Sequence, residues 1–278
     1  MRKTAFAADD NSSPRVRRFL DSWATRVNTP EFIKSDPVCF PRQYSRANDI
    51  EVAAFLTATI AWGRRDLILR SAERMFGLMG KHPFDYVVSG GWKTLESACV
   101  HRTFFENDLA YYCKGLAACY RKYGSLERIF SSAWDIFDGI AAFRREMALA
   151  NAGPSDSGAK KARSPGIPVY SKHIADPDAG SACKRINLAL RWLVRRDGIV
   201  DLGIWKSISP SRLCIPLDVH AGRTARSLGL LMRSQDDRKA VEELTIHLRT
   251  FCPEDPVKYD FALFGIGIEG IVAGSGRF

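Results

Sequence analysis

The chain has 278 residues, enough to bury a real core in one large domain or in two modest lobes. Its composition is ordinary for a globular protein, with 46% hydrophobic and 26% charged residues. No apolar run approaches the length of a membrane span, so we expect no membrane-spanning segment. The net charge of +10 suits a nucleic-acid partner, although many basic proteins bind no nucleic acid.

Amphipathic periodicity predicts helices along most of the chain. In the first, over residues 14–27, Phe19, Leu20, Trp23 and Val27 share one face. Further helices are predicted over residues 48–60, 67–79, 107–123, 126–131 and 134–149. No stretch alternates polar and apolar residues between turn signals, so we predict an all-α fold without a sheet.

The turn over residues 61–66 combines an aromatic residue, a glycine and two arginines. An exposed Trp62 flanked by Arg64 and Arg65 suits insertion into stacked bases together with phosphate contact. The alternative is that Trp62 closes the core and that the two arginines are merely solvated. The residue types alone allow both interpretations.

Residues 151–172 interrupt the helical pattern. Glycine, proline and serine dominate this stretch, so we predict a flexible loop. It is also basic, because Lys160, Lys161, Arg163 and Lys172 oppose a single acidic residue, Asp156. Such a loop either follows a phosphate backbone or is a simple insertion.

The stretch from Lys184 to Gly229 holds the residues of greatest chemical interest. A helix beginning at Lys184 has a buried apolar stripe and a second, basic face that includes Arg191. A lysine at a helix N-terminus is electrostatically unfavourable, so it is either exposed and indifferent or useful as an amine with a lowered pKa. Asp218 is predicted to cap the next helix, either as a cap alone or with a functional role, and Gly229 is predicted to end it.

Two more helices complete the chain. Asp236 or Asp237 is predicted to cap the first, and the pair at residues 255–256 is predicted to begin the second, which Gly265 and Gly267 end. A chain that starts and finishes in helices around an internal helical set fits two lobes with a cleft between them. We place one lobe at about residues 47–200 and the other at about residues 14–46 plus 201–278.

The seven cysteines are scattered, odd in number and form no C-x-x-C pair. We therefore expect reduced thiols and a cytoplasmic location, without a disulfide framework. The histidines are isolated from ligand-type neighbours, and no phosphate-loop, dinucleotide or nucleophile-elbow motif occurs. We accordingly expect neither a metal nor an organic cofactor.

Several segments resemble those of the helix-hairpin-helix DNA glycosylases. IPLDVHAGRTARSLGLL is similar to the family's P-[VL]-D-x-H-x-x-R-x-[AC]-x-R-[LI]-G-L segment, and KRINLAL is similar to its K-[TV]-A-[ND]-x-x-L run. EVAAFLTATIAWGRRDLILRSAERMF resembles the helices that frame the DNA-reading loop, and VEELTIHLRTFCPEDPVKYDFALFGIG resembles the closing pair. The order agrees over most of residues 45–270. The chain also resembles a bacterial family of unknown function that carries PLDxH followed by DPVKYDFALFGIG.

The resemblance implies a two-lobed, all-α fold in which a nucleotide is extruded from duplex DNA into the cleft. Asp218 would be the catalytic carboxylate, and Lys184 would be the amine that attacks C1′ to form a Schiff base. Contacts to nucleic acid are implied for Trp62, Arg64, Arg65, Gly180, Arg191 and Arg223.

The chain departs from the family at the hairpin. Over residues 176–184 only Gly180 remains of the family's glycines, and two extra residues separate it from the lysine. No cysteine follows Cys252, so the iron–sulfur cluster of some members is absent. The function expected is that of a DNA glycosylase acting on damaged or mispaired bases. The alternatives are a non-catalytic nucleic-acid-binding protein of the same fold and a helical interaction scaffold.

Overall fold

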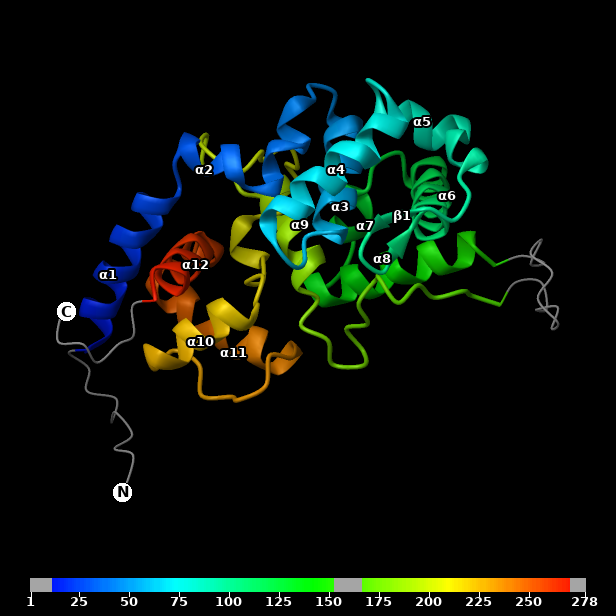
Figure 1. Ribbon diagram of the computed structural model, residues 1–278. Coiled ribbons are helices and arrows are strands. Elements are labelled where there is room, and N and C mark those ends of the chain that lie inside the picture. Colours follow the sequence, from blue (N-terminus) through cyan, green and yellow to red (C-terminus); the bar gives the residue numbers. More distant parts are fainter. Residues whose placement is uncertain (1–11, 153–166, 271–278) are drawn as a thin grey trace.

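The computed structural model describes residues 12–152 and 167–270, and these residues are predominantly helical (Figure 1). The α-helices in order are α1 (Ser12–Val27), α2 (Pro30–Ser35), α3 (Ala47–Thr59), α4 (Arg65–Met79), α5 (Pro83–Ser89), α6 (Glu106–Tyr123), α7 (Glu127–Ser131), α8 (Ile136–Ala150), α9 (Lys184–Val194), α10 (Val219–Ser227), α11 (Arg238–Phe251) and α12 (Tyr259–Glu269). Short 3-10 turns are η1 (Pro37–Cys39), η2 (Pro41–Gln43), η3 (Gly91–Thr94), η4 (Pro210–Arg212) and η5 (Pro256–Lys258).

The β-structure of the described residues is one small antiparallel pair, β1 (Cys99–His101) with β2 (Phe104–Phe105). The all-α prediction is therefore confirmed, whereas the expectation of no sheet is wrong for this one two-stranded pair. Asp218 and Asp237 cap α10 and α11 by accepting the backbone N–H groups of Ala221 and Ala240, as predicted. Gly229 follows α10 at φ +72°, a conformation that favours glycine over residues with a side chain.

Helix α9 lies at the centre of the molecule. Figure 1 shows α3 to α8 on one side of it and α1, α10, α11 and α12 on the other. Buried side chains from both sides, from Leu20 in α1 to Ile266 in α12, belong to one apolar cluster. Because neighbours cover α9 on both sides, its polar residues Asn187 and Arg191 are buried as well as its apolar ones.

The predicted basic face of α9 is consequently buried at Arg191, while the contact to nucleic acid implied for this residue stays a prediction. Its side chain is 4% exposed, and its guanidinium donates to the carboxylates of Asp201 and Asp260. Arg195 is also buried and binds Asp201 and Asp255. Buried cations require paired carboxylates, because desolvation would otherwise cost several kcal/mol. Arg191 is therefore a structural cation on the cleft wall rather than an exposed phosphate contact.

The final helix also differs from expectation. A 3-10 turn, η5, precedes it, and α12 continues through Gly265 and Gly267 to end at Gly270. Gly265 lies where α12 packs on α1, and a Cβ placed there would lie 2.4 Å from the side chain of Val27. Glycine is needed here for close approach of two helices, so it does not act as a helix stop.

A matched pair of alanine substitutions should separate these two uses of glycine. Gly265→Ala is expected to lower the free energy of unfolding by about 1–3 kcal/mol, because the added methyl overpacks the α1–α12 contact. In Gly77→Ala in α4, the added methyl meets no atom within 4 Å, so the free energy of unfolding should instead rise by about 0.5–1 kcal/mol. Urea titrations of both variants measure these changes, and equal effects would contradict the packing argument.

Most of the predicted flexible loop at residues 151–172 lies outside the described residues. At its edges, Val169 donates its backbone N–H to the carbonyl of Ala148, and Tyr170 packs under Arg144.

The seven cysteines are free thiols. Within residues 12–152 and 167–270, no helix has the length and apolar character needed to cross a bilayer.

Candidate functional site

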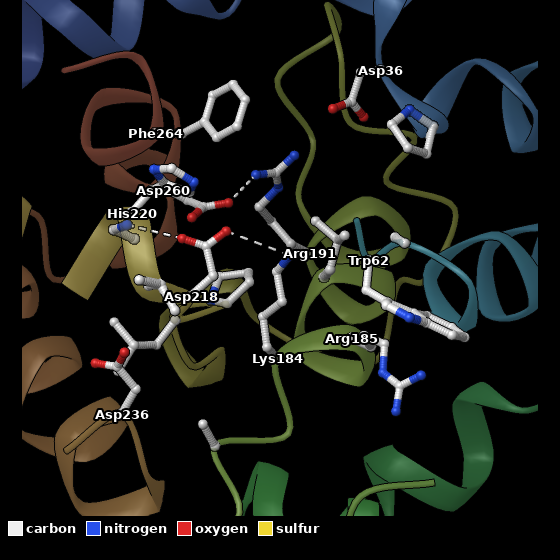
Figure 2. Close-up of a pocket in the computed structure, with 18 of the residues that line it drawn as sticks. Asp36, Trp62, Lys184, Arg185, Arg191, Asp218, His220, Asp236, Asp260 and Phe264 are labelled. Atoms are coloured by element: carbon white, nitrogen blue, oxygen red, sulfur yellow. Dashed lines mark hydrogen bonds and ion pairs between the residues drawn. The ribbon is translucent and has the colours of Figure 1, made fainter. Parts of the chain in front are cut away.

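A cleft of about 1030 Å³ opens where α9, α10, α12 and the turn after α3 meet (Figure 2). Its charged lining residues are Asp36, Arg65, Lys184, Arg185, Arg191, Asp218, Asp236 and Asp260. Four acidic and four basic side chains therefore face a cleft within a protein of net charge +10. The cleft itself is balanced in charge, so its specificity depends on where each group lies.

The two residues predicted as catalytic meet in this cleft. The Nζ atom of Lys184 lies 3.5 Å from Oδ2 of Asp218, and the two side chains are 31% and 28% exposed. Lys184 is the first residue of α9, and Asp218 is the N-cap of α10. The two groups that the resemblance implies as catalytic therefore lie close together, whereas their chemical roles stay a prediction.

Asp218 combines both roles considered from its sequence context. One carboxylate oxygen accepts the backbone N–H of Ala221 at 2.9 Å and caps α10. The other oxygen faces the amine of Lys184. The cap holds the carboxylate in one orientation, so a structural contact here also positions a reactive group.

The start of α9 is unusual in its backbone. Cys183, immediately before Lys184, has φ +49° and ψ +34°, a left-handed conformation that costs a non-glycine residue about 1 kcal/mol or more. The side chain of Cys183 is buried, and its thiol contacts the carbonyl of Ser181. The strained residue directs the first turn of α9, and with it Lys184, into the cleft.

Trp62 lines the cleft but is not an exposed wedge. Its ring is half-buried and stacks on His173 at 5.8 Å between centroids, with the edge of His101 at 4.8 Å. The guanidinium of Arg185 lies 5.0 Å from the centre of the ring. The expectation of a projecting aromatic is therefore wrong, and the alternative in which Trp62 closes the packing describes the structure.

Two buried histidines hold this turn in place. Nε2 of His101 bonds to the carbonyl of Trp62 at 2.9 Å, and Nδ1 bonds to the hydroxyl of Ser71 at 3.0 Å. A carbonyl only accepts, so Nε2 carries a hydrogen and donates it to Trp62. Burial lowers the pKa of His173, which favours a neutral ring against Trp62. The turn is a rigid part of the cleft wall.

The two arginines of the turn have different environments. Arg64 is 75% exposed and binds Asp66 through two hydrogen bonds. Arg65 lines the cleft, lies 3.7 Å from Asp36 and covers the ring of Phe264 at 4.9 Å. Arg64 can therefore reach a partner in solvent, whereas Arg65 forms part of the cleft wall.

The segment at the hairpin position, where the sequence departs from the resembled family, forms a tight turn. Gly180 has φ +83° in a tight turn, and its N–H already donates to the carbonyl of Pro177. Residues 167–175 form no helix, so the described chain has no helix directly before this turn. Arg223 is exposed on α10, outside the lining of the cleft. Gly180 is thus better explained by the turn it allows than by a phosphate contact.

A model of the family described as "Protein of unknown function (DUF2400)" matches residues 36–269. The chain belongs to this family. No curated protein and no solved structure matches the chain. Membership of a family of unknown function agrees with the resemblance noted from the sequence, and the DUF2400 match covers every residue that lines the cleft except Phe32.

Three cleft residues of this DUF2400 protein were missed from the sequence. Burial raises the pKa of Asp36, and Arg185 donates to the carbonyl of Thr59 at the end of α3. Burial likewise raises the pKa of Asp260 to about 6; Asp218 adds to the shift, while Arg191 opposes it. An aspartate inside the apolar run YDFALFGI was the one signal that could have revealed Asp260. The described residues contain no cluster of three metal-ligating side chains.

Proposed function

We propose that this protein is a DNA glycosylase with lyase activity, which acts on a damaged or mispaired base flipped from the duplex into the cleft. The observation that carries the proposal is the 3.5 Å approach of the Lys184 amine to the Asp218 carboxylate inside a cleft. A volume of about 1030 Å³ is sufficient for one nucleotide. An amine beside a carboxylate is the pair that Schiff-base chemistry at C1′ requires.

The proposed mechanism uses the two groups in turn. The carboxylate of Asp218 stabilises the positive charge that develops on the sugar as the base departs with the electrons of the glycosidic bond. The amine of Lys184 then attacks C1′, and Asp218 accepts the proton that the nitrogen loses as the new bond forms. The cap to Ala221 keeps the carboxylate pointed at the sugar throughout.

The proposal gives Arg64 a contact to backbone phosphate. Arg64→Ala is expected to weaken duplex binding and to reduce the slope of log affinity against log salt by about one, because one phosphate contact is lost. Arg70→Ala is a matched control, since Arg70 is 65% exposed and binds the same Asp66. Fluorescence anisotropy with a labelled duplex at several salt concentrations measures both slopes.

Arg65→Ala tests the other half of the turn. Because Arg65 packs on Phe264 and pairs with Asp36, we expect weaker binding with a nearly unchanged salt slope. Identical slopes for wild type and Arg64→Ala would show that the turn does not contact phosphate. The sequence alone treated Arg64 and Arg65 as equivalent contacts to nucleic acid. Their different environments lead us to expect different effects of the two substitutions.

A helical interaction scaffold is the second candidate, and the turn at Gly180 favours it. Its N–H is occupied within the turn, so a device for holding phosphate is missing there. A scaffold predicts no salt-dependent binding of duplex DNA. The same titration therefore separates the two candidates.

Incubation of the full chain with a panel of duplexes tests the proposal directly. The panel carries damaged or mispaired bases and, as a separate member, an abasic site, each with borohydride present. A covalent protein–DNA complex is the expected result, because hydride reduces the Schiff base to a stable amine. Absence of base release and of any complex across the panel would refute glycosylase and lyase activity.

A further inference from the structure

Asp260 is an acidic group of the cleft that the chemistry above does not use. It lies in the first turn of α12, and Figure 2 shows its carboxylate beside that of Asp218. The side chain is 11% exposed and accepts a hydrogen bond from Arg191. Arg191 also binds Asp201 at 3.2 Å, so Asp260 shares its cation with a second, fully buried carboxylate. A buried acid with a shared counter-ion retains its proton more readily than one with a cation of its own.

The charges around Asp260 come from three sides. Helix α9 contributes Arg191 and Lys184, and the start of α10 contributes Asp218, with His220 in the same cleft lining. Toward α1, the charged groups are paired with each other: Lys258 with Asp21 at 2.8 Å, and Arg26 with Glu269 at 2.9 Å. Burial raises the pKa of Asp260 to about 6, with Asp218 adding to the increase and the two cations of α9 opposing it.

We propose that Asp260 is a third catalytic group of the cleft, the acid that protonates the hydroxyl leaving C1′ when Lys184 forms its Schiff base. This role rests on the function proposed above. Two carboxylates in different environments then have different chemical roles. Asp218, which faces the Lys184 amine, accepts protons, and the buried Asp260 supplies one.

On an abasic site, the amine nitrogen of Lys184 forms a bond to the C1′ aldehyde. The proton that this nitrogen loses passes to the carbonyl oxygen, which gives a carbinolamine. The nitrogen lone pair then forms the C=N bond while the C–O bond breaks. The departing hydroxyl takes the proton of Asp260 and leaves as water, and Asp260 remains as a carboxylate bound to Arg191. Cyanoborohydride, the added reductant, transfers hydride to the C=N carbon.

Trapping on an abasic duplex with cyanoborohydride tests this without knowledge of the damaged base. Loss of the Asp260 proton removes the acid that the leaving hydroxyl needs, so wild-type trapping should level off above about pH 6. Asp260→Asn should trap about a hundredfold more slowly than wild type at about pH 5.5. The ratio of the two rates cancels every pH dependence that the proteins share, and it should fall roughly tenfold per unit of pH above about pH 6.

The controls separate catalysis from folding. Asp85→Asn removes a carboxylate that binds Arg46 outside the cleft and should keep the wild-type profile. Asp260→Glu should restore the level profile, and Asp260→Asn should bind the abasic duplex with unchanged affinity in anisotropy.

Two results would overturn the role of Asp260 while leaving the lyase intact. One is a pH profile of Asp260→Asn that equals wild type. The other is a wild-type trapping rate that keeps rising tenfold per unit of pH from pH 6 to 8. This second result needs no variant, so misfolding of a variant cannot affect it. No complex from wild type at any pH would instead refute the lyase activity, and with it the role of Asp260.

Discussion

Lys184→Gln is expected to abolish the borohydride-trapped complex with an abasic duplex, a loss of at least about a thousandfold in trapping rate. Glutamine keeps the polar character and approximate length of the side chain and can still donate to Asp218. It has no nucleophilic nitrogen, so no covalent bond to C1′ can form. Gel analysis of trapped complexes over time measures the loss.

Lys122→Gln is the matched control for this experiment. Lys122 pairs with Glu146 at 2.7 Å, so it too is a lysine in an ion pair, but it lies outside the cleft. We expect its trapping rate to equal wild type. A Lys184→Gln protein that still forms the complex would show that another amine is the nucleophile. Base release that persists while trapping disappears would identify a monofunctional glycosylase.

Asp218→Asn should reduce base release by about 10²–10⁴-fold while largely preserving affinity for the duplex. The amide cannot accept the amine's proton or offset positive charge on the sugar. Asparagine caps helices about as well as aspartate, so the free energy of unfolding should change by less than about 1 kcal/mol. Single-turnover release of the base, together with urea unfolding, measures both quantities.

Two comparisons make the test specific. Asp218→Ala should lose the same activity and in addition about 1 kcal/mol of stability, because the Ala221 N–H loses its acceptor. Asp237→Asn changes the corresponding cap of α11, outside the cleft lining, and should keep wild-type base release. Full base release by Asp218→Asn would reduce Asp218 to a helix cap and would assign the chemistry to another group.

Local signals in the chain were sufficient for the longer helices and for the ends of several of them, but α2 was not predicted. The caps at Asp218 and Asp237 and the stop at Gly229 were predictable, because capping depends on residues within one helical turn. Lys184 was placed at the start of its helix by the apolar periodicity that follows it. These short-range rules also positioned both members of the proposed catalytic pair on helix N-termini.

Long-range packing decided what those rules could not. Arg191 and Asp260 are 69 residues apart, and their contact exists because α9 and α12 meet in space. That meeting buries a face of α9 whose sequence has the pattern of a solvated basic surface. Glycine is a residue type that commonly ends a helix, yet Gly265 lies inside α12, where its lack of a side chain allows close contact with α1.

The same cause explains the cleft. Trp62 is held by His101 and His173, which lie on segments distant in sequence, so its burial could not be read from the turn alone. Asp36 and Asp260 become cleft carboxylates with raised pKa values only when neighbouring helices exclude water from them. Desolvation depends on every element that surrounds a group, and periodicity along one helix carries no information about those elements.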